Sequence, residues 1–272
     1  MISLNLANIP KIPRICYICD AMRYRMDMCY SGDGFCGWQV QPDAPSVQGT
    51  LEQALSTLLK EDVGVTGAGR TDTGVGAFYY VAHFDCSSGM DTEQLVFRLN
   101  AILPKGIAIF GIRPVGDDFH ARFGAVRREY SYFIHRRKNP FIADRSYFYG
   151  YPELDFDAMN RAASLLVGTR DFSCFEKKGA DNRTSVCTIF EAGWHRLDSF
   201  PGADDSCWCF RIAGDRFLRN MVRAIVGTLL EVGRGKRGIE DFRTVLDGGT
   251  RSDAGESVPG YALFLTGIDY QE

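Results

Sequence analysis

The residues best suited to chemistry lie in a glycine-rich segment, residues 67–77, with the sequence G-A-G-R-T-D-T-G-V-G-A. Within it, Arg70 and Asp72 stand two positions apart. A neighbouring cation keeps a carboxylate ionised even in a closed pocket, and an ionised, poorly solvated carboxylate is a usable nucleophile. The alternative is a structural turn in which Asp72 hydrogen-bonds its own backbone. From the residues alone, both interpretations stay open.

This segment does not match the phosphate-binding loops. It lacks the G-K-[ST] ending of a P-loop. A dinucleotide-binding loop follows a strand and opens a helix, whereas this segment follows a predicted helix and leads into a predicted strand. Its glycines allow tight turns and a close approach of the backbone to another group.

Basic residues gather in two clusters, residues 121–138 and 216–237, which hold 12 of the 31 Lys and Arg residues. An even spread would place four or five there. Aromatic rings alternate with the cations of the first cluster, namely Phe123, Tyr130, Tyr132 and Phe133. Rings that stack on unpaired bases beside cations that bind phosphates are typical of RNA recognition. A solvated charged surface is the alternative.

Several separated motifs resemble the tRNA pseudouridine synthase A family. The segment G-R-T-D-T-G-V at residues 69–75 is similar to its G-R-T-D-x-G-V signature. Residues 30–42, 46–52 and 128–132 (R-E-Y-S-Y) resemble its opening strand, first helix and second motif. Residues 139–141, 171–175 and 217–227 match later landmarks, so the resemblance extends over residues 22–270.

The resemblance implies an isomerase that converts uridine to pseudouridine at positions 38, 39 and 40 of the tRNA anticodon stem-loop. It implies Asp72 as the nucleophile, Arg70 as the neighbour that helps expel the uridine from the stack, and Tyr130 as the ring against the base. Arg223 is either a basic partner of Asp72 or a phosphate-binding arginine. The other residues expected to contact the substrate are Leu218, Arg128 and Arg219, and we expect Leu218 and Leu265 at the floor of the site.

The chain departs from the family pattern at three positions, with Gly76 and Cys36 where histidine is common and Cys187 where a basic residue is frequent. None is a catalytic position. The reaction breaks the N1–C1′ bond and joins C5 to C1′ without gaining an atom, so we expect no cofactor. The family resemblance also implies a homodimer.

The elements that must position these residues follow from hydrophobic periodicity and turn signals. We predict helices over residues 46–61, from about 92 to 103, over 155–167 and over 216–232. We predict strands over residues 23–30, 79–85, 107–115, 127–135, 188–197, 207–213 and 261–270.

These elements predict an α+β fold of two similar halves, each with a largely antiparallel sheet flanked by helices, and an active-site cleft between them. The expected N-terminal half is residues 22–118 and the C-terminal half is residues 119–272. Residues 1–21 show no period, so we expect a flexible extension, or translation that begins at Met22.

The composition and the residue spacing indicate which class of protein this is. The chain has 272 residues, a net charge of -3 and 45% hydrophobic residues, typical of a globular protein. The nine cysteines and four histidines lack the spacing of a zinc site, and we expect no metal. No apolar run could span a bilayer, so we expect a cytoplasmic protein.

Two rival functions remain, a catalytically inactive RNA-binding module and a hydrolase that pairs Asp72 with a carboxylate such as Asp85.

Overall fold

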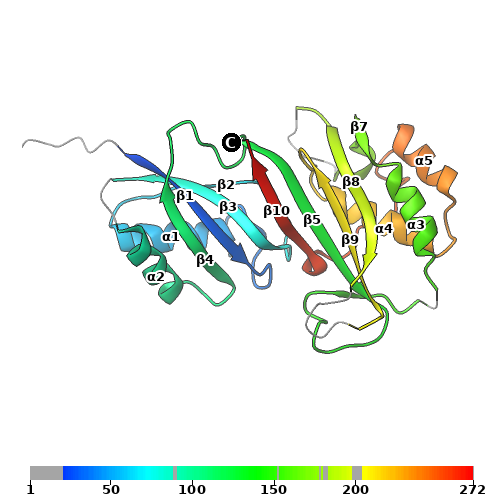
Figure 1. Ribbon diagram of the computed structural model, residues 1–272, viewed down its shortest axis with the longest axis horizontal. Helices are drawn as coiled ribbons and strands as arrows, with labels where there is room; N and C mark the ends of the chain where they lie inside the picture. Colours follow the sequence, from blue (N-terminus) through cyan, green and yellow to red (C-terminus); the bar gives the residue numbers. More distant parts are fainter. Residues whose placement is uncertain are drawn as a thin grey trace, which may run out of the picture.

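The computed structural model describes residues 21–87, 91–151, 153–177, 179, 183–197 and 204–271. The predictions about residues 1–20, a flexible extension or a start at Met22, therefore lie outside the described residues. In the described part of the chain, five α-helices accompany one sheet of ten strands (Figure 1). The helices are α1 (Val47–Leu59), α2 (Thr92–Ile102), α3 (Phe156–Ser164), α4 (Met221–Gly233) and α5 (Ile239–Gly248).

The strands are β1 (Met22–Tyr30), β2 (Val65–Gly67), β3 (Gly76–Cys86), β4 (Ile107–Pro114), β5 (Ala125–His135), β6 (Tyr147–Phe148), β7 (Gly168–Asp171), β8 (Val186–Arg196), β9 (Cys207–Gly214) and β10 (Leu263–Tyr270). Their order in the sheet is β4-β1-β3-β10-β5-β9-β8-β7, with β2 beside β3 and β6 beside β5. Most neighbours are antiparallel, and only β10–β3 and β5–β6 are parallel among the described pairs.

The mixed α+β class is as predicted, but the expectation of a separate sheet in each half is wrong. The last strand, β10, lies between β3 and β5 and pairs with both, so all the strands belong to one sheet (Figure 1). Leu265 on β10 stands opposite Ala77 on one side and Tyr130 on the other. The C-terminal strand therefore joins the strand that follows the glycine-rich segment to the strand that carries the second motif.

The helices form two groups over the sheet. Helices α1 and α2 contact each other near β4 and β2, and α3, α4 and α5 contact one another near β8 (Figure 1). A single apolar core runs under both groups, from Met26 and Leu51 to Phe210 and Ile225. In β1, alternation sends every second side chain into this core, namely Tyr24, Met26, Met28 and Tyr30.

Helix boundaries follow local signals. Ser46 caps α1 by accepting a hydrogen bond from the Gly49 amide, as its position before the apolar period predicts. Helix α4 begins at Met221, five residues later than the predicted start at residue 216. The reason is Asn220, whose backbone has a φ of 65° in the left-handed region and cannot be part of a right-handed helix. Residues 216–220 instead form the connection from β9.

The sequence analysis did not predict three short strands and one helix. They are β2, β6, β7 and helix α5. Helix α5 has apolar residues at Ile239, Phe242, Val245 and Leu246, the last three of them buried, so its pattern was visible in the sequence. Strands of two to four residues, such as β6 and β7, are too short to show a period.

Candidate active site

The glycine-rich segment lies between β2 and β3, and three aromatic residues hold it through hydrogen bonds to its backbone and to the Thr71 side chain. The Tyr80 hydroxyl accepts a hydrogen bond from the Gly69 amide at 3.2 Å and donates one to the Gly69 carbonyl. The Tyr30 hydroxyl lies 3.0 Å from the Thr71 hydroxyl, and the Trp38 amide donates to the Thr71 carbonyl at 3.3 Å. The rings of Tyr30, Trp38 and Tyr80 pack together in the core. The residues on both sides of Arg70 are therefore held by a rigid support.

Two glycines outside the segment let the chain approach it closely. Gly37 has a φ of 94°, and a Cβ there would lie 2.4 Å from the Thr71 carbonyl oxygen. A Cβ on Gly32 would lie 2.3 Å from the backbone of Gly74. Only glycine fits at these contacts, which explains why residues 30–38 are rich in glycine. This stretch forms a wall against the segment that carries Asp72.

Asp72 forms an ion pair with Arg223 from α4. The distance between Arg223 Nη1 and Asp72 Oδ2 is 3.2 Å, and the two side chains are 22% and 26% exposed. Arg223 Nε also donates to the Val258 carbonyl at 2.8 Å, which fixes the plane of the guanidinium. Of the two interpretations of Arg223, the ion pair corresponds to the first, a basic partner of Asp72. The carboxylate is thus oriented by a cation 151 positions away in sequence.

Tyr130 lies in β5 with its ring almost wholly buried, at 9% exposure. Its ring edge packs on Phe217 at 5.1 Å between centroids. Burial raises the pKa of the Tyr130 hydroxyl to about 12, and the Asp72 carboxylate adds to this rise while Arg128 opposes it. The hydroxyl is therefore neutral at physiological pH. Leu265, directly across from Tyr130, and Leu218 are both buried, as expected for an apolar floor.

Arg70 and Arg219 are both exposed. Neither side chain makes a hydrogen bond or ion pair with any residue that the structure describes. Arg219 follows Leu218 in the connection from β9 to α4, three residues after Arg216, whose side chain is partly exposed. Their cationic groups are therefore available to an anionic ligand.

Arg128 is arranged differently from the other predicted contacts. Its guanidinium donates hydrogen bonds to backbone carbonyl oxygens on several segments, those of Ala68, Arg122, Ala125 and Asp215. The expectation that Arg128 contacts the substrate through its guanidinium does not fit this arrangement, because the N–H groups are already used.

At Gly76, where histidine is common in the family, the space is occupied by another residue. A Cβ on Gly76 would lie 2.8 Å from two ring atoms of Phe264 and 3.1 Å from the Tyr30 carbonyl oxygen. Phe264 in turn stacks on Phe78 with centroids 4.4 Å apart. The departure at Gly76 is therefore matched by a phenylalanine cluster on the sheet face away from the helices.

Several cations of the two basic clusters already have acidic or aromatic partners within the protein. Arg127 pairs with Glu129, Glu191 and Asp269. Others have the following partners: Arg137 pairs with Asp204 and Asp205, Lys236 and Arg237 pair with Glu231, and Arg234 lies over the ring of Tyr151. The remaining cations near Asp72 are thus the main candidates to bind an anion.

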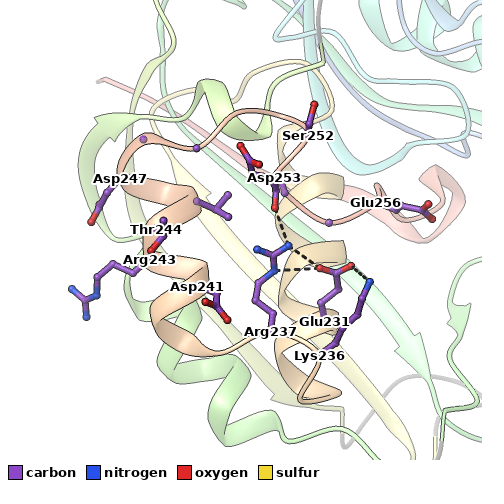
Figure 2. Close-up of a pocket in the computed structure, with 15 residues that line it drawn as sticks. Glu231, Lys236, Arg237, Asp241, Arg243, Thr244, Asp247, Ser252, Asp253 and Glu256 are labelled. Carbon is purple, nitrogen blue, oxygen red and sulfur yellow. Dashed lines mark hydrogen bonds and ion pairs between the residues drawn. The ribbon is translucent and has the colours of Figure 1, made fainter.

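A surface hollow lies away from these residues. It has a volume of about 1110 Å³, between α5 and the loop that follows it (Figure 2). Figure 2 shows Arg237 and Lys236 directed at Glu231, so both cations on this wall share one carboxylate partner. None of the predicted site residues lines it. The described residues also include no group of three or more His, Cys, Asp or Glu that could hold a metal ion, and no described helix is long and apolar enough to cross a membrane.

The hydrolase alternative needs a second carboxylate near Asp72, and Asp85 does not provide it. Asp85 pairs with Arg23 at the far end of β3, at 2.8 Å. Nine residues of strand separate it from Gly76 by about 30 Å, and the four residues back to Asp72 can recover at most about 14 Å. The two carboxylates are therefore farther apart than the roughly 5 to 9.5 Å of paired glycosidase carboxylates.

The sequence analysis missed the residues that support the site. Tyr30 and Trp38 stood in a motif of the resemblance without a role, and Tyr80 stood in a predicted strand as one of its apolar positions. Their hydroxyl and amide contacts with the segment are set by tertiary packing. Only the position of Tyr80 within a predicted strand, where the structure has it buried, could have indicated one of them.

Comparisons with known proteins place the chain among sequences of one family. A model of the family described as tRNA pseudouridine synthase matches residues 162–271. The chain is 47% identical over 251 residues to a tRNA pseudouridine synthase A of Bacteroides thetaiotaomicron, which covers 92% of this chain and 91% of that protein. It is 46% identical over 250 residues to one of Porphyromonas gingivalis, covering 91% and 97%. It is 38% identical over 252 residues to one of Bacillus subtilis, covering 92% and 99%.

Proposed function

The chain belongs to the tRNA pseudouridine synthase A family, and on that premise we propose that it isomerises uridine to pseudouridine in tRNA with Asp72 as the nucleophile. The proposed substrate site is the anticodon stem-loop at positions 38, 39 and 40, and the proposed location is the cytoplasm. The observation that carries the proposal is the Asp72–Arg223 ion pair beside Tyr130 and the exposed Arg70.

The reaction balances without an added reactant. The N1–C1′ bond breaks, the detached uracil turns, and C5 joins C1′. The hydrogen on C5 leaves as a proton, and N1 gains a proton. Two routes begin at the Asp72 carboxylate, attack on C1′ with formation of a sugar ester, or removal of a proton from C2′. Both need the carboxylate that the ion pair with Arg223 orients.

The other residues have roles that follow from their positions. Removing a base from its stack costs about a few kcal/mol, and stacking on an aromatic ring returns about 1 to 3 kcal/mol. Tyr130 is placed to supply that ring, and its neutral hydroxyl can donate a hydrogen bond. Arg70, exposed and without a protein partner among the described residues, is placed to fill the gap that the departing uridine leaves. Leu218 and Leu265 exclude water that would hydrolyse a sugar intermediate.

The reaction is tested by tritium release from tRNA labelled with [5-³H]uridine. The protein should release one tritium for each pseudouridine found after nuclease digestion. Transcripts with cytidine in place of uridine at positions 38, 39 and 40 should release none. Binding of tRNA without tritium release would instead support the catalytically inactive RNA-binding module.

The family resemblance further supports a homodimer as the working form. Sedimentation equilibrium measures this directly. A mass near twice the monomer mass of 30.4 kDa is the expected result, and a single monomeric species at assay concentrations would contradict it.

A further inference from the structure

The guanidinium of Arg128 uses every N–H group that it has. Nε and Nη2 donate to the Ala68 carbonyl at 3.3 and 3.0 Å. Nη1 donates to the carbonyls of Ala125 and Asp215 at 3.1 and 2.7 Å. The second Nη2 hydrogen bond goes to the Arg122 carbonyl at 2.6 Å. An arginine has five N–H donors, so none remains for a phosphate.

The charge of Arg128 is balanced in an unusual way. Its partners are all backbone carbonyls, and no carboxylate within the described chain pairs with it. Burial accordingly lowers the pKa of the guanidinium. Its neighbour Arg127, on the opposite face of β5, pairs instead with Glu129, Glu191 and Asp269. Burying a cation without a carboxylate partner costs desolvation free energy. The arrangement of carbonyls around Arg128 must therefore have a structural reason.

Two of the four carbonyls bound by Arg128, those of Ala68 and Asp215, belong to the two stretches that meet at the ion pair, while those of Arg122 and Ala125 lie before and at the start of β5. Ala68 precedes Asp72 by four residues in the glycine-rich segment. Asp215 follows β9 and begins the connection that carries Phe217, Leu218 and then Arg223 on α4. The Asp215 carboxylate accepts hydrogen bonds from the Thr188 and Arg216 amides at 2.8 and 2.7 Å, so its own position is fixed.

We propose that Arg128 is a positioning residue, which sets the distance between the Asp72 segment and the connection that leads to Arg223. This proposal rests on the proposed function, because it concerns the geometry of the same site. In it Arg128 touches neither the uridine nor a phosphate. Its side chain binds Ala68 through Nε and Nη2 and Asp215 through Nη1, at different edges of one rigid plane, and Tyr130 lies two residues further along the same strand.

Lysine cannot replace this arrangement. Its ammonium is a single point with three N–H donors, whereas the guanidinium reaches four carbonyls in different directions from one plane. A lysine keeps the charge and much of the side-chain length but loses the fixed spacing. The Arg128→Lys variant therefore separates charge from geometry, and Arg128→Met removes both.

The test compares Arg128→Lys and Arg128→Met with the matched control Arg127→Met. For each variant we would measure the single-turnover rate at saturating tRNA, the tRNA Kd and the slope of log Kd against log salt. Since a misplacement of about 1 Å can cost about 100-fold in rate, we expect Arg128→Met to lose about 100-fold and Arg128→Lys about 10-fold. Kd and the salt slope should stay at wild-type values, and Arg127→Met should keep the wild-type rate.

Other outcomes would overturn the proposal. A phosphate contact would appear as a weaker Kd with a salt slope lower by about 0.7 to 0.9 and an unchanged rate at saturation. A purely structural role would lower the melting temperature while the rate of the folded variant stayed normal. If Arg128→Met does not fold by circular dichroism, the Arg128→Lys comparison decides alone. Tritium release by the wild-type protein tests the proposed function separately.

Discussion

At the scale of single residues, the site depends on side chains that approach from distant parts of the chain. Asp72 and Arg70 are neighbours in sequence, but the group that contacts the carboxylate is Arg223. Tyr80 holds the backbone of the segment that carries Asp72, and Tyr30 contacts the hydroxyl of the adjacent Thr71. A nucleophile needs a fixed direction as well as a charge, and these contacts supply it.

Two buried tyrosines give a matched prediction. The Tyr132 hydroxyl is buried and has no hydrogen-bond partner among the described residues, whereas the Tyr80 hydroxyl bonds both the amide and the carbonyl of Gly69. An unsatisfied buried hydroxyl costs about 1 to 3 kcal/mol. We expect Tyr132→Phe to keep or slightly raise the free energy of unfolding, and Tyr80→Phe to lower it by about 1 to 2 kcal/mol and to slow turnover.

Urea denaturation and the tritium assay measure both effects. Equal losses of stability in the two variants would mean that the Tyr132 hydroxyl has a partner after all. A Tyr80→Phe variant with full turnover would mean that the anchored segment does not need this hydroxyl.

At the scale of elements, α4 and the segment that follows α5 are fitted to each other. A Cβ on Gly227 of α4 would lie 1.8 Å from the Glu256 carbonyl oxygen. This segment continues to Val258, whose carbonyl accepts a hydrogen bond from Arg223. We expect Gly227→Ala to lower the free energy of unfolding by about 1 to 3 kcal/mol and to reduce turnover, because the partner of Arg223 must move.

The control for this change is Gly248→Ala at the end of α5. No atom lies within 4 Å of a Cβ at that position. Alanine is the better helix former by up to about 1 kcal/mol, so stability should hold or rise slightly. Thermal unfolding and the tritium assay compare the two variants, and a Gly227→Ala variant as stable and active as Gly248→Ala would refute the close fit.

The helices and strands also show which parts of the fold the sequence could predict. Helix α1 was predictable because Val47, Leu51 and Leu55 repeat on one face behind the cap residue Ser46. The start of α4 was not, because the apolar pattern continues past Asn220 while the backbone does not. The single sheet was not predictable either, since β10 pairs with strands about 130 and 190 residues away and no local pattern records such pairing.

The candidate site shows the same division. The resemblance indicated Asp72, Tyr130 and Arg223, which the structure brings together. Sequence counting could not tell that Arg127 meets Glu191 and Asp269, or that Arg128 binds carbonyls. Folding brings acidic residues from distant parts of the chain next to a basic cluster. The number of basic residues in a cluster is therefore larger than the number of cations that are free to bind RNA.

At the scale of the whole molecule, the core contains many tyrosines whose ionisation burial opposes. Burial raises the pKa of the Tyr130 hydroxyl to about 12, and it also raises the pKa of Tyr30, Tyr80, Tyr132 and Tyr270. A pKa that is higher in the folded than in the unfolded state gives stability that is complete below the unfolded value and is lost as the pH rises. For Tyr130 alone, a rise of about two pH units corresponds to about 2 to 3 kcal/mol.

We therefore expect the free energy of unfolding to be flat with respect to these groups below about pH 10 and to fall steeply above it. Urea midpoints across this range, together with phenolate absorbance, measure the loss. Titration of any of these five tyrosines near pH 10 while the protein stays folded would contradict the burial of their hydroxyls.

The central claim is that the Asp72 carboxylate starts the isomerisation, and the comparison of Asp72→Asn with Asp85→Asn tests it most directly. Both changes remove a carboxylate from an ion pair with an arginine, but only Asp72 lies at the site. In single-turnover tritium release at saturating tRNA, we predict no detectable release by Asp72→Asn, near-normal release by Asp85→Asn, and similar tRNA Kd values for both. Near-normal release by Asp72→Asn would contradict the account.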